Sequence, residues 1–212
     1  MTDGVSQWVD AVVAATPPPP EGRRLIVALG GPPASGKSTL AAALADHWGP
    51  ACALLPLDGF HFDDVVLDAR GHRARKGAPH TFDAVGFGVL LEAVRTRPSV
   101  ELGVPRFDRS LELSRAAAAV IGPEQRIVVV EGNYLHVDVE PWSSIADLYD
   151  VTVGLQVDES ELRRRILARW SEHGFSEAEA LRRWGENDGP NARWVAEYTR
   201  KTHLSLAAGQ TG

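Results

Sequence analysis

The segment GGPPASGKST, residues 30–39, decides the fold expected for this chain of 212 residues. It follows the apolar run RRLIVALGG and precedes residues typical of a helix over 37–48, the strand–loop–helix context that a phosphate-binding loop requires. Gly31 and Gly36 permit backbone conformations that aim consecutive N–H groups inward, and the start of the helix adds the positive end of its dipole. We therefore expect this loop to bind the phosphates of a nucleotide.

The lysine of this loop stands out, because only three of the 22 basic residues are lysines. A compact ammonium fits beside phosphates inside a tight loop, where an arginine fork is too bulky. We expect Lys37 to contact the β- and γ-phosphates and Ser38 to bind magnesium. The expected nucleotide-binding residues of the loop are Gly31, Ala34, Ser35, Gly36, Lys37, Ser38 and Thr39.

The remainder of the chain alternates apolar and helical segments, which predicts parallel strands joined by crossover helices. The apolar segments are almost continuous in Val, Ile, Leu and Ala, as expected when both faces of a sheet are covered. We expect an α/β three-layer sandwich of the P-loop NTPase type, with a central, mostly parallel sheet and a helical lid. Strands are expected at RRLIVALGG, ACALLPLD, RIVVVEGN and DVTVGLQVD, and helices at 37–48, 81–97, 143–149 and 159–173.

Other segments are less regular. Residues 101–108 and 115–121 are expected to form short strands flanking a loop at the edge of the sheet. From residue 159 the chain should be mostly helical, with a break at ENDGPN and a return as a final strand over 203–207.

The N-terminal part separates from the rest at a run of four prolines, Pro17–Pro20. Prolines end a helix and favour a stiff extended segment, so residues 1–22 are expected to form a helix and a tether. Binding of the prolines to a proline-reading module is the alternative to a simple spacer. Residues 23–212 form the expected P-loop domain, with its lid around 160–190.

Composition excludes several classes of function. A formal charge of −6 argues against a general nucleic-acid binder, because affinity for a phosphate backbone depends on summed positive charge. No apolar run is long enough to cross a bilayer and the N-terminus lacks a signal-peptide pattern, so we expect a cytoplasmic protein without membrane partners. The single cysteine, Cys52, cannot form an internal disulfide or a zinc cluster.

Two acidic residues end predicted strands on the same side of the sheet as the loop. Asp58 follows ACALLPL and Glu131 ends RIVVVE. Ligands of α/β sheets bind at the carboxyl ends of the strands, so both residues should line one crevice with the loop. We assign Asp58 as general base and magnesium ligand, and Glu131 as a magnesium ligand. The alternative is that either acid caps a helix or faces solvent.

Basic and polar residues in two loops are candidates for a small-molecule acceptor site. RARKGAPHTFD, residues 73–83, is suited to an anionic substrate, although such charge runs are usually solvated surface. VPRFDRS, residues 104–110, offers polar pairs of the kind that hold sugar hydroxyls, with a purely structural role as the alternative. The expected acceptor-binding residues, including three beside the strand ends, are Asp58, His61, Arg75, Lys76, Arg106, Asp108 and Asn133.

Two arginines of the predicted helix 159–173 share one face. Arg165 and Arg169 are four residues apart, and this face could close over the phosphates, excluding water and supplying positive charge. Glu161 and Glu172 leave an ordinary solvated helix as the alternative. We assign Arg165 and Arg169 to nucleotide binding, and Lys37, Asp58 and Arg169 to catalysis.

Five segments in this order, GPPASGKST, PLDGFHF, RKGAPHTFD, VPRFDRS and VVVEGNYL, resemble the phosphoribulokinase/uridine kinase/pantothenate kinase family of P-loop kinases. The resemblance covers residues 23–207 and is greatest to bacterial kinase-like proteins associated with fructose transport. It implies ATP- and Mg²⁺-dependent phosphorylation of a hydroxyl of a small metabolite, with Asp58 as base and magnesium partner.

The resemblance leaves the acceptor open. The chain lacks the tyrosine that uridine kinases place after their aspartate, and it is short for a pantothenate kinase or phosphoribulokinase. A fructose-like sugar is the leading candidate, and a nucleoside or pantothenate-like acceptor is the alternative. A regulatory P-loop NTPase switch is the competing class. The resemblance is the only reason to expect ATP rather than GTP as the nucleotide. The oligomeric state is open, with a homodimer as one possibility.

Overall fold

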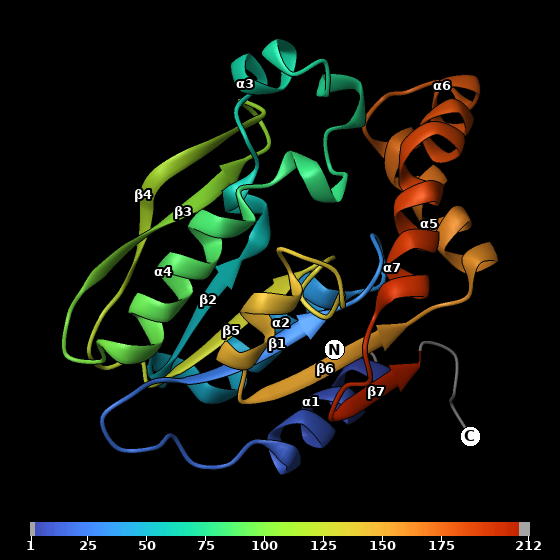
Figure 1. Ribbon diagram of the computed structural model, residues 1–212. Helices are drawn as coiled ribbons and strands as arrows, with labels where there is room; N and C mark the ends of the chain where they lie inside the picture. Colours follow the sequence, from blue (N-terminus) through green and yellow to red (C-terminus); the bar gives the residue numbers. More distant parts are fainter. Residues whose placement is uncertain (1–2, 208–212) are drawn as a thin grey trace.

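The computed structural model describes residues 3–207, which form a five-stranded parallel sheet between two layers of helices (Figure 1). The strand order is β2-β5-β1-β6-β7, and every neighbouring pair is parallel. The predicted α/β P-loop architecture is confirmed. The strands are β1 Leu25–Gly30, β2 Cys52–Pro56, β5 Ile127–Gly132, β6 Val151–Gln156 and β7 Leu204–Ala207, and the flanking helices are α1 Asp3–Ala15, α2 Lys37–Trp48 and α4 Ala84–Thr96.

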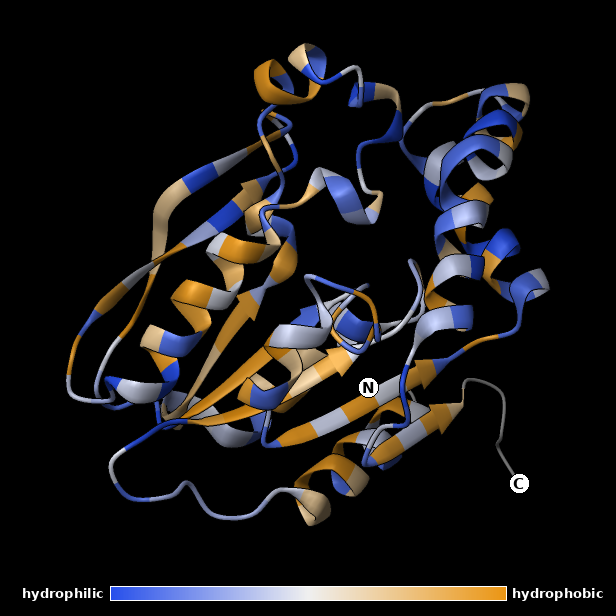
Figure 2. Cartoon of the chain, viewed as in Figure 1, coloured by the Kyte–Doolittle hydropathy of each residue, from blue (hydrophilic) through white to orange (hydrophobic). Residues whose placement is uncertain are grey.

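Alternate residues of the central strands face opposite sides of the sheet, and each side has its own core. Ile26 and Ala28 of β1 pack with α4 and the short 3₁₀ helix η5 (Ser143–Leu148), whereas Leu25, Val27 and Leu29 pack with α1 and α2. Figure 2 shows the central strands as hydrophobic along most of their length. Burial on both faces explains why these strands read as continuous apolar runs.

The N-terminal helix α1 is part of this packing. Val9 and Val12 are buried against the same face as α2. The chain then passes Pro17–Pro20 before entering β1. Residues 1–2 and 208–212, which the expected N-terminal and P-loop segments include, lie outside the described residues.

The two segments are strands joined by a loop, as predicted, but they form a separate two-stranded antiparallel sheet, so their expected place at the edge of the main sheet is wrong. β3 (Leu102–Asp108) pairs with β4 (Leu113–Ile121), with a register shift between Val104 and Arg106. Pro105 lies at this shift and has no N–H to donate to a further strand. The hairpin packs on the turn η2 (Leu57–Phe60), where a Cβ at Gly59 would lie 2.7 Å from the carbonyl oxygen of Pro105.

The expected break at ENDGPN is also wrong. Residues Trp184–Asp188 form a π-helical turn, η6, that continues directly into α7 (Gly189–Tyr198). Pro190 lies in the first turn of α7, directly after the π-helical turn, in which Gly189 N–H donates to the carbonyl oxygen of Trp184. This irregular turn accommodates the proline without ending the helix. With α5 (Glu159–Glu172) and α6 (Glu177–Arg183), these elements form the helical region beside the sheet where the lid is expected, and this region is called the lid below (Figure 1).

The segment between β2 and α4 contains α3 (Asp64–Ala69) and the 3₁₀ turns η3 (Arg73–Arg75) and η4 (Pro79–Thr81), while η1 (Gly49–Ala51) precedes β2. The helix α4 begins three residues later than predicted because Asp83 is its N-cap, accepting a hydrogen bond from Gly86 N at 2.9 Å. The final strand expected over 203–207 is confirmed as β7. None of the helices within residues 3–207 has the length and apolar character needed to cross a bilayer.

Candidate active site

Three neighbouring strands bring the predicted phosphate loop and the two predicted carboxylates to the same edge of the sheet. The order β2-β5-β1 places β5 between the other two strands. Glu131 pairs with Leu29 on one side and with Pro56 on the other. Asp58 follows β2 by two residues and the loop follows β1 directly. Convergence at the carboxyl ends is therefore fixed by the strand register.

The loop from residue 31 to residue 36 has the backbone of an anion cradle. Gly31 has φ 151° and Gly36 has φ 100°, and Ala34 adopts the left-handed region at φ 62°. A Cβ at Gly31 would lie 2.7 Å from the carbonyl oxygen of Leu155, so glycine is required there. Helix α2 begins at Lys37, which directs its first N–H groups and its dipole toward the loop. Thr39 is exposed in this first turn.

Lys37 is buried within the loop that it follows. Its Nζ donates hydrogen bonds to the carbonyl oxygen of Pro32 at 2.8 Å and to Oγ of Ser35 at 3.4 Å. Burial lowers the pKa of Lys37 to about 8, against the charges of Glu131 and Asp58, which favour the protonated form. Arg169 adds a smaller lowering of this pKa. Both hydrogen-bond partners of the ammonium are neutral, and it has no carboxylate partner among the described residues. Its surroundings therefore suit a bound anion.

Ser38 and Glu131 are joined directly. Ser38 Oγ donates a hydrogen bond to Oε1 of Glu131 at 3.1 Å. Burial raises the pKa of Glu131, and the nearby Asp58 carboxylate raises it further, while Lys37 and Ser38 act in the opposite direction. A buried carboxylate with a second carboxylate nearby forms a site suited to a cation.

Asp58 is held by an arginine from the hairpin. Nη2 of Arg109 donates to Oδ2 of Asp58 at 2.6 Å, and both side chains are partly open to solvent. Arg109 belongs to the segment 104–110, whose polar pairs were expected to hold sugar hydroxyls, and no partner for it was predicted. Its partner could not be identified from the sequence, because the hairpin folds back over η2.

The lid reaches the phosphate loop through Arg165. Its Nη1 donates to the carbonyl oxygen of Ala34 at 3.3 Å, while its Nε donates to Oε1 of Glu161 at 2.8 Å. Arg169 lies one turn further along the same face and stacks over the ring of Trp170 at 5.4 Å. Both arginines predicted for nucleotide binding therefore lie on the face of α5 that is turned toward the loop.

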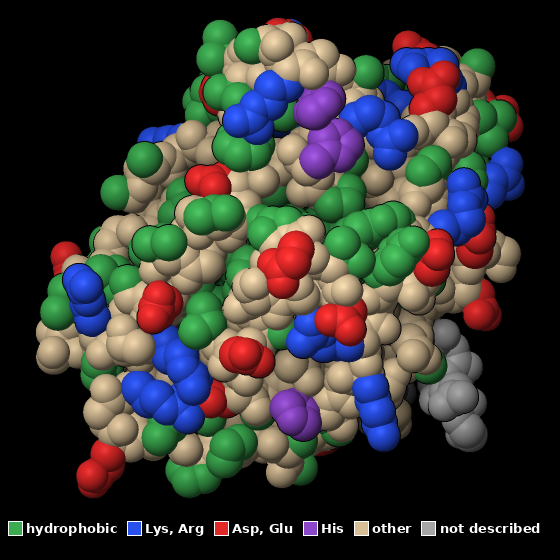
Figure 3. Space-filling model, in the orientation of Figure 1, with side chains coloured by type: hydrophobic (Ala, Val, Ile, Leu, Met, Phe, Trp, Pro, Cys, Tyr) green, Lys and Arg blue, Asp and Glu red, His purple; other side chains and the backbone are tan. Residues whose placement is uncertain are grey.

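The basic segment 73–76 divides into residues with and without carboxylate partners. Lys76 pairs with Asp64 at 2.7 Å and with Glu112 at 3.3 Å. Arg75 instead donates to Oδ1 of Asn187 at 3.2 Å and to Oδ1 of Asn191 at 3.3 Å. Among the described residues, the Arg75 guanidinium therefore has neutral hydrogen-bond partners and no carboxylate partner. Figure 3 shows Lys and Arg side chains spread over this face of the molecule, with Asp and Glu side chains beside them over the lid.

The other predicted acceptor residues lie around the same edge of the sheet with different partners. Nη2 of Arg106 donates to the carbonyl oxygen of Leu54 at 3.0 Å, and burial lowers its pKa. Asp108 closes the hairpin turn by accepting from the hydroxyl of Ser110 at 2.6 Å. His61 contacts the carbonyl oxygen of Asp58 through Nδ1 at 2.9 Å, and burial lowers its pKa. Asn133 is half-buried, two residues beyond Glu131.

Sequence reasoning missed the polar residues of the π-helical turn. Asp188 is buried and accepts a hydrogen bond from Nε1 of Trp170 at 2.9 Å, and burial raises its pKa. Nδ2 of Asn187 donates to the carbonyl oxygen of Lys76 at 2.9 Å, which ties the lid to the basic segment. The available signal was the polar cluster in ENDGPN, which was interpreted only as a helix break.

Comparison with known proteins gives relatives that cover most of the chain. No protein-family model matches. A Schizosaccharomyces pombe protein named "Putative uridine kinase C227.14" is 36% identical over 172 residues, covering 76% of this chain and 73% of that protein. YggC of Escherichia coli is 34% identical over 184 residues, covering 84% of this chain and 75% of that protein.

A solved structure agrees over nearly the whole length. The "putative fructose transport system kinase" of Silicibacter sp. TM1040 is 37% identical, has a TM-score of 0.87, and is matched over 97% of this chain and 98% of its own.

Proposed function

Because this chain belongs to the uridine kinase/pantothenate kinase-like family of P-loop kinases, we propose that it transfers the γ-phosphate of ATP to a hydroxyl of a small metabolite. The observation that supports this most strongly is the convergence of Lys37, Asp58 and Glu131 at the ends of three adjacent strands. A nucleotide switch needs the loop, whereas a transferase also needs a base beside an acceptor.

Each residue of the loop has a part in holding the triphosphate. The N–H groups between Gly31 and Thr39, including those of Ala34, Ser35 and Gly36, would donate to the phosphates, and the Lys37 ammonium would contact the β- and γ-phosphates. Arg165 and Arg169 would bring the lid face of α5 over the same phosphates, which excludes water and supplies positive charge.

Asp58 would accept the proton of the attacking hydroxyl. Its carboxylate lies at the end of β2 and is held in place by Arg109 at 2.6 Å. A base fixed in this way reduces the loss of orientation on reaching the transition state. Arg109 would thus act as a positioning residue for Asp58.

Magnesium fits the donor set at this edge of the sheet. Ser38, Asp58 and Glu131 provide hydroxyl and carboxylate oxygens, the ligands that Mg²⁺ prefers. Within residues 3–207 no three His, Cys, Asp or Glu side chains are placed to hold a metal by themselves. When bound, the ion would neutralise charge on the β- and γ-phosphates.

For the acceptor we propose a fructose-like sugar, supported by the polar side chains around Asp58. His61, Arg75 and Arg106 offer donors that suit sugar hydroxyls, with Lys76, Asp108 and Asn133 as further members of the proposed acceptor site. The names of the relatives point to different acceptors, so a nucleoside or a pantothenate-like acceptor is the alternative.

A panel assay tests the proposal. The protein is incubated with ATP, MgCl₂ and, separately, fructose, other sugars, nucleosides and pantothenate, and ADP release is measured. Release that depends on one acceptor supports a kinase and identifies its substrate. Equal release with and without every acceptor supports the regulatory switch instead. Replacing ATP by GTP in the same assay determines the nucleotide preference.

A further inference from the structure

Two asparagines of the lid orient the side chain of Arg75. Its Nε donates to Oδ1 of Asn187 at 3.2 Å, and its Nη2 donates to Oδ1 of Asn191 at 3.3 Å. Both amides are held in turn, because Nδ2 of Asn187 donates to the carbonyl oxygen of Lys76 at 2.9 Å and Nδ2 of Asn191 donates to Oδ1 of Asn187 at 3.2 Å. Asn191 is only 3% exposed. The guanidinium is therefore fixed in direction before any ligand binds.

These contacts occupy one edge of the Arg75 guanidinium and leave another edge free. The asparagines face the edge formed by Nε and one hydrogen of Nη2. The terminal edge, formed by Nη1 and the second hydrogen of Nη2, has no hydrogen-bond partner within residues 3–207. Arg75 is half-buried, and its Nη1 has surface open to solvent. A free terminal edge of this kind binds a carboxylate or a phosphate through two parallel hydrogen bonds.

Arg75 lies on the same side of the sheet as the proposed base, Asp58. The hydroxyl of Tyr134 donates to the carbonyl oxygen of Gly77 at 2.5 Å, two residues after Arg75. The chain then returns to η2, where Asp83 N–H donates to the carbonyl oxygen of the last residue of that turn at 2.8 Å. Burial raises the pKa of Tyr134, the charge of Arg75 opposes this rise, and the charge of Asp58 adds to it. A small acceptor at Asp58 can therefore present a second group to Arg75.

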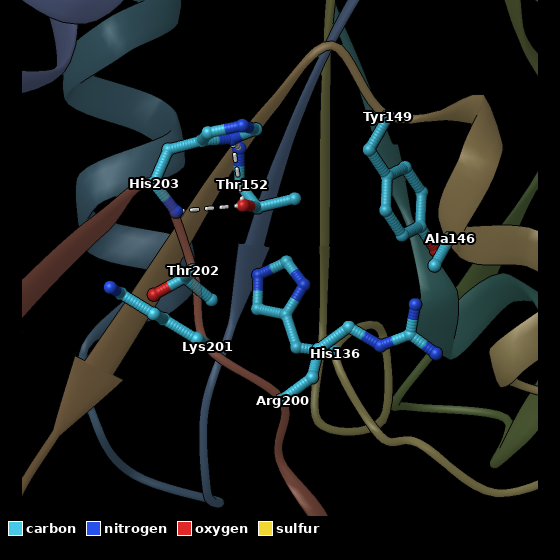
Figure 4. Close-up of a pocket in the computed structure, with 8 residues that line it drawn as sticks. All are labelled: His136, Ala146, Tyr149, Thr152, Arg200, Lys201, Thr202 and His203. Atoms are coloured by element: carbon cyan, nitrogen blue, oxygen red, sulfur yellow. Dashed lines mark hydrogen bonds between the residues drawn. The ribbon is translucent and has the colours of Figure 1, made fainter.

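The cavity at the amino ends of β6 and β7 contains no comparable group (Figure 4). Its two cations, Arg200 and Lys201, lie on opposite sides of His136 and do not converge. Arg200 is also paired with the Asp138 carboxylate at 2.6 Å. Arg75, with neutral partners and a free edge, is therefore the better candidate for anion recognition.

We propose that Arg75 binds an oxyanion of the acceptor, a carboxylate or a phosphate, so that the substrate is a sugar acid or a sugar phosphate rather than a neutral sugar. This inference rests on the proposed transfer to a sugar hydroxyl at Asp58. The charged group anchors one end of the acceptor while the hydroxyl to be phosphorylated lies at Asp58. Asn187 and Asn191 are positioning residues, because their neutral amides orient the guanidinium and leave its charge available to the ligand.

Binding measured without turnover tests the inference. Heteronuclear NMR spectra are recorded with a saturating non-hydrolysable ATP analogue and MgCl₂, while fructose, fructose 6-phosphate, glucose and gluconate are titrated separately. We expect saturable shifts of the signals of residues 75–77 and 187–191, with at least one anionic probe binding about 10-fold more tightly than the neutral sugar of its pair. A response to fructose 6-phosphate alone identifies a phosphate group, and a response to gluconate alone identifies a carboxylate.

Three variants connect this charge preference to Arg75. Arg75→Gln should weaken binding of the anionic probe by about 10- to 100-fold and leave binding of the neutral sugar nearly unchanged. Asn187→Asp keeps the shape of the side chain but places a carboxylate beside the guanidinium, so it should also weaken anion binding selectively. Arg73→Gln, which removes an exposed arginine already paired with Asp64 and Asp68, is the matched control and should bind as the unmodified protein does.

The outcomes separate this inference from the proposed kinase activity. Absence of saturable shifts with both anionic probes, equal affinity for charged and neutral sugars, or equal anion affinity of Arg75→Gln and Arg73→Gln would overturn the inference. Acceptor-dependent ADP release with neutral sugars only would also overturn it, while leaving the phosphoryl transfer intact. Charge-dependent binding at Arg75 without ADP release from any acceptor would instead contradict the transfer and keep Arg75 as an anion-binding residue.

Discussion

Ser38 Oγ donates a hydrogen bond to Oε1 of Glu131 across 3.1 Å, joining the first turn of α2 to the carboxyl end of β5. The two residues are 93 positions apart in the chain, and the register of β1 with β5 brings them together. The hydroxyl and the carboxylate thus lie side by side next to the phosphate loop, as proposed for two ligands of one magnesium ion.

This pair predicts how the enzyme responds to magnesium. Glu131→Gln removes a charge that would bind the cation, so the Mg²⁺ concentration needed for half-maximal rate should rise by about 10- to 100-fold. The measurement is initial rate against free Mg²⁺ at saturating ATP. Glu124→Gln, which changes an exposed acid in the turn before β5, is the control. Unaltered Mg²⁺ dependence in Glu131→Gln would exclude Glu131 as a metal ligand.

Lys37 predicts how ATP binding depends on pH. Its pKa is about 8 in the free protein, and a bound triphosphate favours the ammonium and raises that pKa. Binding therefore takes up a proton above the free pKa, and ATP affinity should fall about 15-fold as the pH rises from about 8 to about 9.5. Calorimetry in buffers of different ionisation enthalpy measures both the affinity and the proton uptake. In Lys37→Met the affinity should be weak and independent of pH over this range, and a persistent fall would assign the titration to another group.

The lid contact predicts a difference between two adjacent arginines. Arg165 donates to the carbonyl oxygen of Ala34 in the phosphate loop, whereas the neighbouring Arg164 pairs only with Glu161 at the surface. Arg165→Ala should raise KM for ATP about 3- to 10-fold and lower kcat, because positive charge is lost beside the phosphates. Arg164→Ala should leave both constants nearly unchanged. Equal effects of the two substitutions would exclude a lid function for this face of α5.

Arg24 predicts a large effect on stability. Its side chain is fully buried and its guanidinium donates to six backbone carbonyl oxygens, on α4, on the segment that follows α4, and around the turn between β4 and β5. Arg24→Lys keeps the charge but offers three donors at most, so several carbonyls lose their partner. We expect the free energy of unfolding to fall by about 2–4 kcal/mol.

Urea denaturation of Arg24→Lys measures this loss. Arg164→Lys is the matched control, because the exposed pair that it alters should contribute less than about 1 kcal/mol. A midpoint of Arg24→Lys equal to that of the control would show that the six hydrogen bonds add little to stability.

The sequence predicted those helices and strands whose formation depends on a pattern within the segment itself. Continuous apolar runs indicated strands covered on both faces, and the segment 30–39 fixed the strand–loop–helix unit. Two features were wrong because longer-range packing decides them. Strands β3 and β4 pair with each other and not with the main sheet, and residues Trp184–Asp188 stay helical as a π-helical turn that accommodates Pro190.

In the candidate site, too, some features follow from local sequence patterns and others depend on long-range packing. Lys37, Ser38, Asp58 and Glu131 were identifiable because parallel strands present their carboxyl ends at one edge. The pairing of Arg109 with Asp58, and of Arg75 with Asn187, joins segments whose approach depends on the hairpin and the lid. No local pattern in either segment encodes these contacts.

The most direct test of the proposed phosphoryl transfer is the rate of acceptor-dependent ADP release by Asp58→Asn, measured together with its affinity for an ATP analogue. If Asp58 takes the proton of the acceptor hydroxyl, the rate should fall by about 10²- to 10⁴-fold while nucleotide affinity changes little. Asp68→Asn, which changes an exposed acid of α3, should behave as the unmodified protein. Full turnover in Asp58→Asn would contradict the account.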